Sequence, residues 1–257
     1  EVWSANGGQS GRNTIDHREL LRVLPVLSEA DLLVFLVGIN DLQPTLSMEG
    51  ASTQELLELN AVEFIRNVQN GGKRQRPSRP YFKRTELFDL LKRSSAGIID
   101  DLSPTSVLTR FGVGPGSYFT VKRNQRSSFD MVAPLDLTIG LQEYRERLVL
   151  LADECGIREI RCLFLTQPSM WRADLPEYER SLLWFGWVNR VDEPVGYLSV
   201  SDLAIAMDRY NQTLLDLCVD EGLECFDLAA VVPKDITGFF DDVHFNESGS
   251  RIVADSV

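Results

Sequence analysis

A continuous apolar stretch over residues 32–37 constrains the fold of this chain most strongly. It has the length of a strand, contains no polar residue and ends at Gly38-Ile39-Asn40-Asp41. Strands covered on one face alternate apolar and polar residues, whereas parallel strands buried on both faces are apolar throughout. The stretch therefore predicts a parallel strand between two layers of helices, with Asn40 and Asp41 just beyond its carboxyl end.

Two later segments of strand length, residues 160–165 and 224–228, are mainly apolar, although they contain Arg161, Glu224 and Asp227, and they are predicted as further core strands. Each is preceded by a helical pattern and by a glycine where a C-terminal cap is expected: residues 141–153 with Gly156, and residues 201–220 with Gly222. Residues 2–5 are a further predicted strand, and residues 16–27 a further helix. Alternating strands and helices predict a doubly wound α/β/α sheet, in which ligands bind beyond the carboxyl ends of the strands.

The composition is that of a globular domain and excludes one class of partner. Of the 257 residues, 44% are hydrophobic and 25% are charged, and the net charge is −12. A polyanion is bound by a concentrated positive surface, so nucleic acid is not expected as a partner. No apolar run reaches the ~18 residues of a membrane span.

The four cysteines are predicted to be buried free thiols. Cys155 and Cys218 fall near the ends of predicted helices, and Cys162 and Cys225 lie in the strands that follow. Because no Cys-x-x-Cys spacing occurs, neither a metal site nor a redox motif is expected.

Residues 43–130 form a long insertion between core strands, within what is otherwise one domain over residues 1–257. We expect a lid over the ligand-binding edge of the sheet. A cluster of Lys and Arg residues in the insertion hints at binding to an anionic surface such as phospholipid or acidic polysaccharide. A solvated loop is the favoured interpretation of this cluster. The predicted parts of the insertion are a helix from a capping box at residues 52–55 to residue 68, a basic loop over 71–80, a helix over 85–93 and a glycine-rich loop over 111–117.

Near the C-terminus, His244 lies three residues after Asp241 and just before a predicted helix. A carboxylate beside an imidazole fixes its tautomer and stabilises the imidazolium, which makes a general base near neutral pH. Asp242 is the alternative orienting carboxylate. The chain has two histidines, and His17, within a predicted helix, is interpreted as a packing or solvated residue.

Three separated blocks resemble those of the SGNH/GDSL hydrolases, which carry a Ser, a Gly, an Asn and a His in four blocks. They are the segment around Gly11, the Gly-Ile-Asn-Asp ending at Asp41, and the Asp-x-x-His ending at His244. The resemblance implies a flavodoxin-like sheet in three α/β/α layers. It also implies that His244 is the base, that Asp241 orients it, and that the Gly11 amide and the Asn40 side chain form an oxyanion hole.

The Ser block of the family has no counterpart in this sequence. The family places it after the first strand, ahead of the Gly block, and residues 2–5 correspond to the second strand. We therefore expect a piece of a longer protein, truncated at both ends, whose nucleophile lies upstream. Ser10 is a weaker candidate, because it lacks the second glycine of the Gly-x-Ser-x-Gly elbow.

The resemblance implies a serine ester hydrolase that forms an acyl-enzyme and uses no metal or cofactor. Its substrate would be an ester-bearing small molecule, a lipid or an acylated glycan. The sequence leaves the location open, with an extracytoplasmic or envelope-associated one as a candidate. The alternatives are an O-acyltransferase on glycans, a non-catalytic glycan- or lipid-binding module and a flavodoxin-like nucleotide binder. Four aromatic residues line either an acyl or sugar pocket or the core: Trp171, Trp184, Phe185 and Trp187.

Overall fold

The computed structural model describes residues 11–47, 115–189 and 194–257. Three parallel strands form its main sheet, in the order β1 (Leu32–Leu36), β2 (Arg161–Leu165) and β5 (Glu224–Phe226). Long helices lead into the second and third strands, α7 (Thr138–Ile157) into β2 and α9 (Val200–Glu221) into β5. The predicted mixed α/β fold with a parallel sheet is confirmed.

Shorter elements surround this sheet. They are α1 (Thr14–Val23), η1 (Pro25–Glu29), α2 (Ile39–Ser47), α6 (Pro115–Ser128), α8 (Glu177–Arg180), β3 (Trp187–Val188), β4 (Gly196–Tyr197), η3 (Leu228–Ala230) and α10 (Glu247–Ser256). No helix in the described ranges is both long enough and apolar enough to cross a bilayer.

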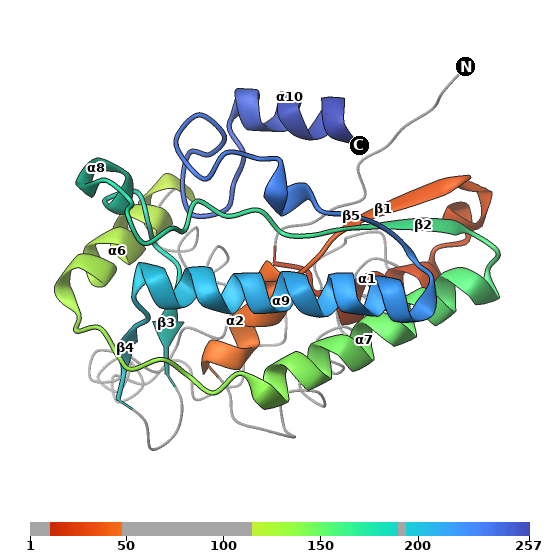
Figure 1. Ribbon diagram of the computed structural model, residues 1–257, viewed down its shortest axis with the longest axis horizontal. Coiled ribbons are helices and arrows are strands. Elements are labelled where there is room, and N and C mark those ends of the chain that lie inside the picture. Colours follow the sequence, from red (N-terminus) through yellow and green to blue (C-terminus); the bar gives the residue numbers. More distant parts are fainter. Residues whose placement is uncertain (1–10, 48–114, 190–193) are drawn as a thin grey trace, which may run out of the picture.

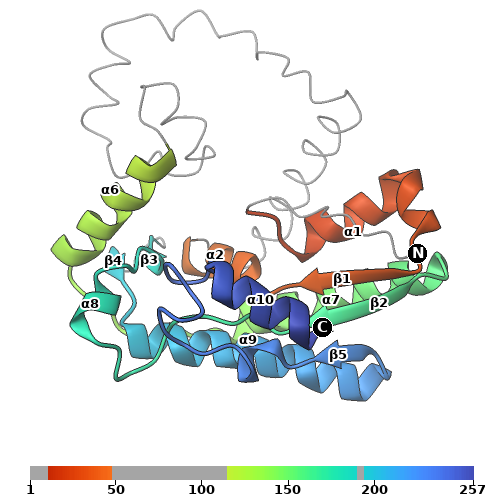
Figure 2. The ribbon, with the colours of Figure 1, turned by 90° about the horizontal axis from the view of Figure 1, so that it is seen from above.

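The two faces of the sheet are covered unequally. Helices α1, α7 and α9 lie on one side and α10 on the other (Figures 1 and 2). In β1, Phe35 is buried under the first layer, whereas Leu32, Val34 and Leu36 are 39%, 46% and 37% exposed. The prediction that this strand is buried on both faces is therefore wrong, because the second layer leaves the outer face of β1 partly open.

One of the two predicted glycine caps is confirmed. Gly222 follows α9 in the left-handed conformation, with φ of 65°, and its amide donates to the Cys218 carbonyl. The cap predicted at Gly156 is wrong. Helix α7 continues through this glycine to Ile157, and Arg158 caps it in the right-handed conformation. The cap position needs no glycine, because the positive φ of the turn into β2 falls one position later, at Glu159.

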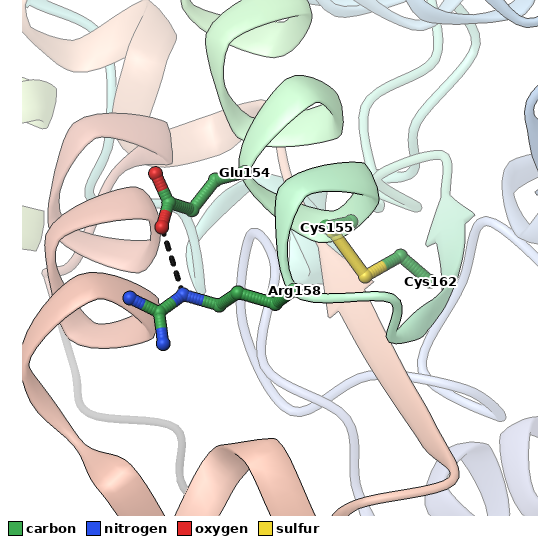
Figure 3. Close-up of a disulfide and its surroundings, with 4 residues drawn as sticks. All are labelled: Glu154, Cys155, Arg158 and Cys162. Atoms are coloured by element: carbon green, nitrogen blue, oxygen red, sulfur yellow. Dashed lines mark hydrogen bonds and ion pairs between the residues drawn. A yellow bond between two sulfur atoms is a disulfide. The ribbon is translucent and has the colours of Figure 1, made fainter.

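The four cysteines form two disulfides, so the prediction of free thiols is wrong. Cys155 of α7 pairs with Cys162 of β2, and Cys218 of α9 with Cys225 of β5, each across seven positions. Figure 3 shows the first bridge beside Arg158, whose Nε donates to Glu154 Oε1 at 2.8 Å. Both bridges join the end of a helix to the strand that follows it. The turn between them brings the two Cα atoms to 6.3 and 6.2 Å, a distance that suits a disulfide.

Reduction of these bridges is expected to lower the free energy of unfolding by about 2 kcal/mol for each, because short closed loops restrict the unfolded chain. Urea unfolding with and without dithiothreitol measures the difference. The double variant Cys155→Ser/Cys162→Ser lacks one bridge, so dithiothreitol should lower its free energy of unfolding only by the contribution of the other bridge. Equal midpoints in the two conditions would contradict the expectation.

Much of the predicted insertion over residues 43–130 lies outside the described residues. This holds for the helix from residue 52 to 68, the basic loop, the helix over 85–93 and the first part of the glycine-rich loop, as it does for the strand over residues 2–5. The described parts correct two boundaries. Residues 43–47 continue α2, and residues 115–117, expected as loop, begin α6.

Candidate functional site

The chain leaves β1 through Gly38 and enters α2 at once. Gly38 has φ of 131°, and a Cβ added to it would lie 2.8 Å from Met207 Cε of α9 and 3.2 Å from Gln167 Cβ. Only glycine combines this backbone conformation with such a close approach. The sharp turn places Asn40 and Asp41 in the first turn of α2, beyond the carboxyl end of the sheet as predicted.

Asp41 ties α2 to two other helices. Its carboxylate accepts hydrogen bonds from the Thr14 amide at 3.3 Å and the Thr14 hydroxyl at 2.8 Å, at the start of α1. It also pairs with Arg147 Nε of α7 at 3.3 Å, and both side chains are 1% exposed. Burial raises the pKa of the Asp41 carboxyl, and the guanidinium acts in the opposite direction. Asp41 therefore serves as an anchor between α2, α1 and α7.

Asn40 reaches the segment that contains Gly11. Its Nδ2 donates to the Arg12 carbonyl at 2.8 Å, across 28 positions of sequence. An asparagine amide has two N–H groups, and this bond uses one of them. Gly11 has φ of 78°, and an added Cβ would contact nothing within 4 Å. Glycine is thus favoured there by its backbone conformation.

Asp241 and His244 form a hydrogen-bonded pair. His244 Nδ1 lies 2.9 Å from each oxygen of the Asp241 carboxylate, which also accepts the backbone amides of Val243 and His244 at 3.1 and 3.0 Å. Burial raises the pKa of the Asp241 carboxyl, but the hydrogen bonds from His244 and the two amides outweigh it, and the net pKa is lowered. Asp241 is therefore a charged acceptor that faces the imidazole.

The carboxylate in turn changes the imidazole. Its hydrogen bond with Asp241 raises the pKa of His244 above the ordinary value of 6.5, against the opposing effect of burial. The side chain is 40% exposed. Because Nδ1 faces Asp241, Nε2 is the ring nitrogen that remains for a substrate, and within the described residues it makes no hydrogen bond. An imidazole that is fixed through Nδ1 and accessible at Nε2 has the arrangement that a general base needs.

Aromatic rings surround this imidazole. Phe119 of α6 meets it edge-on with centroids 5.8 Å apart, while Trp184 and Phe240 stack on it at 6.2 and 5.4 Å. Phe240 is 52% exposed. Of the four aromatic residues predicted for a pocket, Trp184 contacts His244, whereas Trp171 and Phe185 are buried in the core.

Asp242, the alternative orienting carboxylate, faces away from His244. It is fully buried and accepts hydrogen bonds from Trp171 Nε1 at 2.8 Å and from the Trp184 amide at 2.6 Å. Burial raises the pKa of its carboxyl to about 6, although these donors and the nearby Arg126 favour the charged form. The geometry thus places Asp241, and not Asp242, beside the imidazole.

The loop that carries the pair is shaped by the start of α10. Asn246 caps this helix by accepting the Gly249 amide at 2.9 Å, and the His244 carbonyl accepts the Phe240 amide at 3.1 Å. A Cβ on Gly249 would overlap the carbonyl oxygen of Gly238. Gly249 therefore permits the close contact with Gly238 that closes the loop around His244.

The sequence-predicted residues thus form two local groups at one edge of the sheet. Asn40 is joined to the segment after Gly11, and Asp241 to His244. The loop after β2 approaches both, since Gln167 lies beside Gly38 and the Met170 amide donates to the Asp242 carbonyl at 2.8 Å. Among the described residues, no hydrogen bond joins Asn40 directly to His244.

The remaining candidates are placed away from this edge or outside the described residues. His17 of α1 packs against Phe35 with centroids 5.7 Å apart, and burial lowers its pKa to about 4, which fits the predicted packing role. Ser10 lies outside the described residues. In the described ranges, no group of three or more His, Cys, Asp or Glu side chains is arranged to hold a metal ion.

Comparison of the chain with protein-family models, curated proteins and solved structures finds no match. Any function assigned to it therefore depends on the geometry of these two groups.

Proposed function

We propose that this chain supplies the general base and the oxyanion-stabilising side of a serine ester hydrolase of the SGNH/GDSL type, on a flavodoxin-like α/β/α fold. The Asp241–His244 pair carries the proposal. A half-exposed imidazole whose Nδ1 is fixed by a buried carboxylate is the central element of acyl-transfer sites that use a serine. The parallel sheet and the position of both groups at one of its edges support it.

The chemistry assigns one role to each residue. The serine oxygen bonds to the ester carbonyl carbon while His244 Nε2 takes the proton of the serine hydroxyl. The carbonyl oxygen becomes an oxyanion, which the second N–H of Asn40 and the Gly11 amide stabilise. The C–O bond to the alcohol then breaks and His244 returns the proton to the leaving alcohol. Water, deprotonated by His244, next attacks the acyl-enzyme, which releases the acid and restores the serine.

The proposal requires a nucleophilic serine, and the resemblance puts it ahead of residue 1. The direct test is therefore an assay of the full-length gene product on short p-nitrophenyl esters, together with labelling by a fluorophosphonate probe. We expect turnover and labelling at a single upstream serine. Labelling at Ser10 would reassign the nucleophile, and neither turnover nor labelling would favour the non-catalytic binding module.

Asn40→Ala is expected to lower kcat by ~10²–10³ with little change in KM, because an oxyanion-hole donor acts in the transition state. Steady-state kinetics of the full-length protein measure both constants. Asn124→Ala, at an exposed position of α6, is a matched control that should retain wild-type values. A rise in KM at unchanged kcat would assign Asn40 to substrate binding instead.

One observation favours an O-acyltransferase on glycans as a second candidate. The half-exposed ring of Phe240 stacks on His244, and exposed aromatic rings next to catalytic groups are suitable surfaces for sugar rings. A glycan hydroxyl would then replace water in the second step. Comparing acyl transfer to water with transfer to a glycan separates the two activities.

The disulfides support an extracytoplasmic or envelope-associated location, since such bonds persist in oxidising compartments.

A further inference from the structure

A second interaction reaches the Asp241 carboxylate from the side opposite the loop. Trp184 Nε1 donates to Asp241 Oδ2 at 3.1 Å, from a position 57 residues earlier in the chain. The backbone amides of Val243 and His244 donate to the other oxygen, Oδ1. The carboxylate is therefore held on both sides, with the imidazole of His244 between its two oxygens.

The Trp184 segment is itself fixed by buried charges. Asp242 Oδ2 accepts the amides of Trp184 at 2.6 Å and Phe185 at 3.4 Å. On the other side of the segment, Arg126 Nη1 of α6 donates to the Phe185 carbonyl at 2.6 Å, and its Nη2 to the Leu198 carbonyl at 2.9 Å. Bonds to charged partners are the strong ones, and these lie away from water.

We propose that Trp184 is a positioning residue for the Asp241–His244 pair, and that Asp242 sets its place. Asp242 holds the backbone of residues 184 and 185, and the indole N–H then fixes the rotation of the Asp241 carboxylate toward the imidazole. The positioning of the Asp241 carboxylate by Trp184 is inferred from the structure alone. The effect of Trp184 on catalysis rests on the proposed ester hydrolysis.

A donor on Asp241 also changes how strongly the carboxylate attracts a proton. The indole N–H stabilises the negative charge of the carboxylate, which then holds the imidazolium of His244 less strongly. The charged groups that act on the imidazole are Asp241 and Asp242, and Arg126 acts on Asp242. Removing the indole N–H is therefore expected to raise the pKa of His244.

The test is an NMR pH titration of the imidazoles in the full-length protein and its Trp184→Phe variant. Phenylalanine keeps a ring beside His244 and removes the donor. We expect the pKa of His244 to rise in this variant and that of the distant His17 to stay constant. In an Asp241→Asn background, the same substitution should leave the pKa of His244 unchanged, because the effect passes through the carboxylate. An unchanged pKa in the first background, or equal shifts in both, would overturn the proposal.

A second readout does not depend on how well Trp184→Phe folds. In the otherwise native protein, the Trp184 indole N–H signal should shift as His244 titrates and should exchange slowly with solvent. Asp241→Asn should weaken the dependence on pH, and a signal insensitive to both would contradict the proposed contact. These measurements need no substrate, so a failed esterase assay would refute the proposed function and leave this contact standing. If ester turnover is found, Trp184→Phe should lower kcat about tenfold at similar KM.

Discussion

Replacement of His244 by alanine in the full-length protein is expected to lower kcat for ester hydrolysis by ~10⁴–10⁶, because the residue acts as base and acid in both steps. Kinetics on a p-nitrophenyl ester measure the loss. His17→Gln is the matched control, since it changes the other histidine of this chain and should keep near wild-type turnover. A His244→Ala variant with more than a tenth of wild-type kcat would remove the base from the proposed mechanism.

The same assignment fixes the sign of the pH dependence. A general base must be neutral, so kcat/KM should fall as the pH drops through the pKa of His244. Asp241 holds this pKa above its ordinary value of 6.5. The Asp241→Asn variant should therefore show a lower plateau, with its acidic limb moved to lower pH. A limb that stays in place would mean that another group controls it.

Loss of the buried charge at Asp41 is expected to have the largest effect on stability. Asp41→Asn keeps the shape of the side chain but leaves Arg147 charged and buried, which typically costs about 3–5 kcal/mol of unfolding free energy. Glu143, 3.5 Å from Arg147 Nη1, moderates the loss. Urea denaturation monitored by circular dichroism measures it.

A double variant separates this charge effect from the loss of hydrogen bonds. Asp41→Asn/Arg147→Met removes both charges and should be more stable than Asp41→Asn alone. Glu224→Gln, which breaks the exposed ion pair with Arg161, should change stability little by comparison. If Asp41→Asn were as mild as Glu224→Gln, the anchoring role of Asp41 would be wrong.

The features that the sequence predicted correctly are local in sequence. Mainly apolar segments of strand length located the three strands of the main sheet, and the three-residue spacing of Asp241 and His244 predicted their contact. Gly222 was predicted on the same basis. Such patterns succeed because the partners are only a few residues apart.

The features that were missed depend on partners far apart in sequence or on the coverage of a whole face. No pattern linked Trp184 to Asp241, because the two meet through the buried contacts of Asp242. The apolar run of β1 indicated burial on two sides, whereas the actual coverage depends on where α10 lies. The cysteines were missed for a different reason. Their equal spacing was visible in the sequence, but only the folded turns show that each pair is close enough to form a disulfide.

These paired cysteines have a consequence for local motion. Helix ends usually fray, and the strand that follows a fraying helix loses a fixed starting point. Here the last turns of α7 and α9 are clamped to the first residues of β2 and β5 by covalent bonds. Local opening at these junctions is thus suppressed. The N-terminal ends of β2 and β5 stay attached to α7 and α9, the helices that precede them.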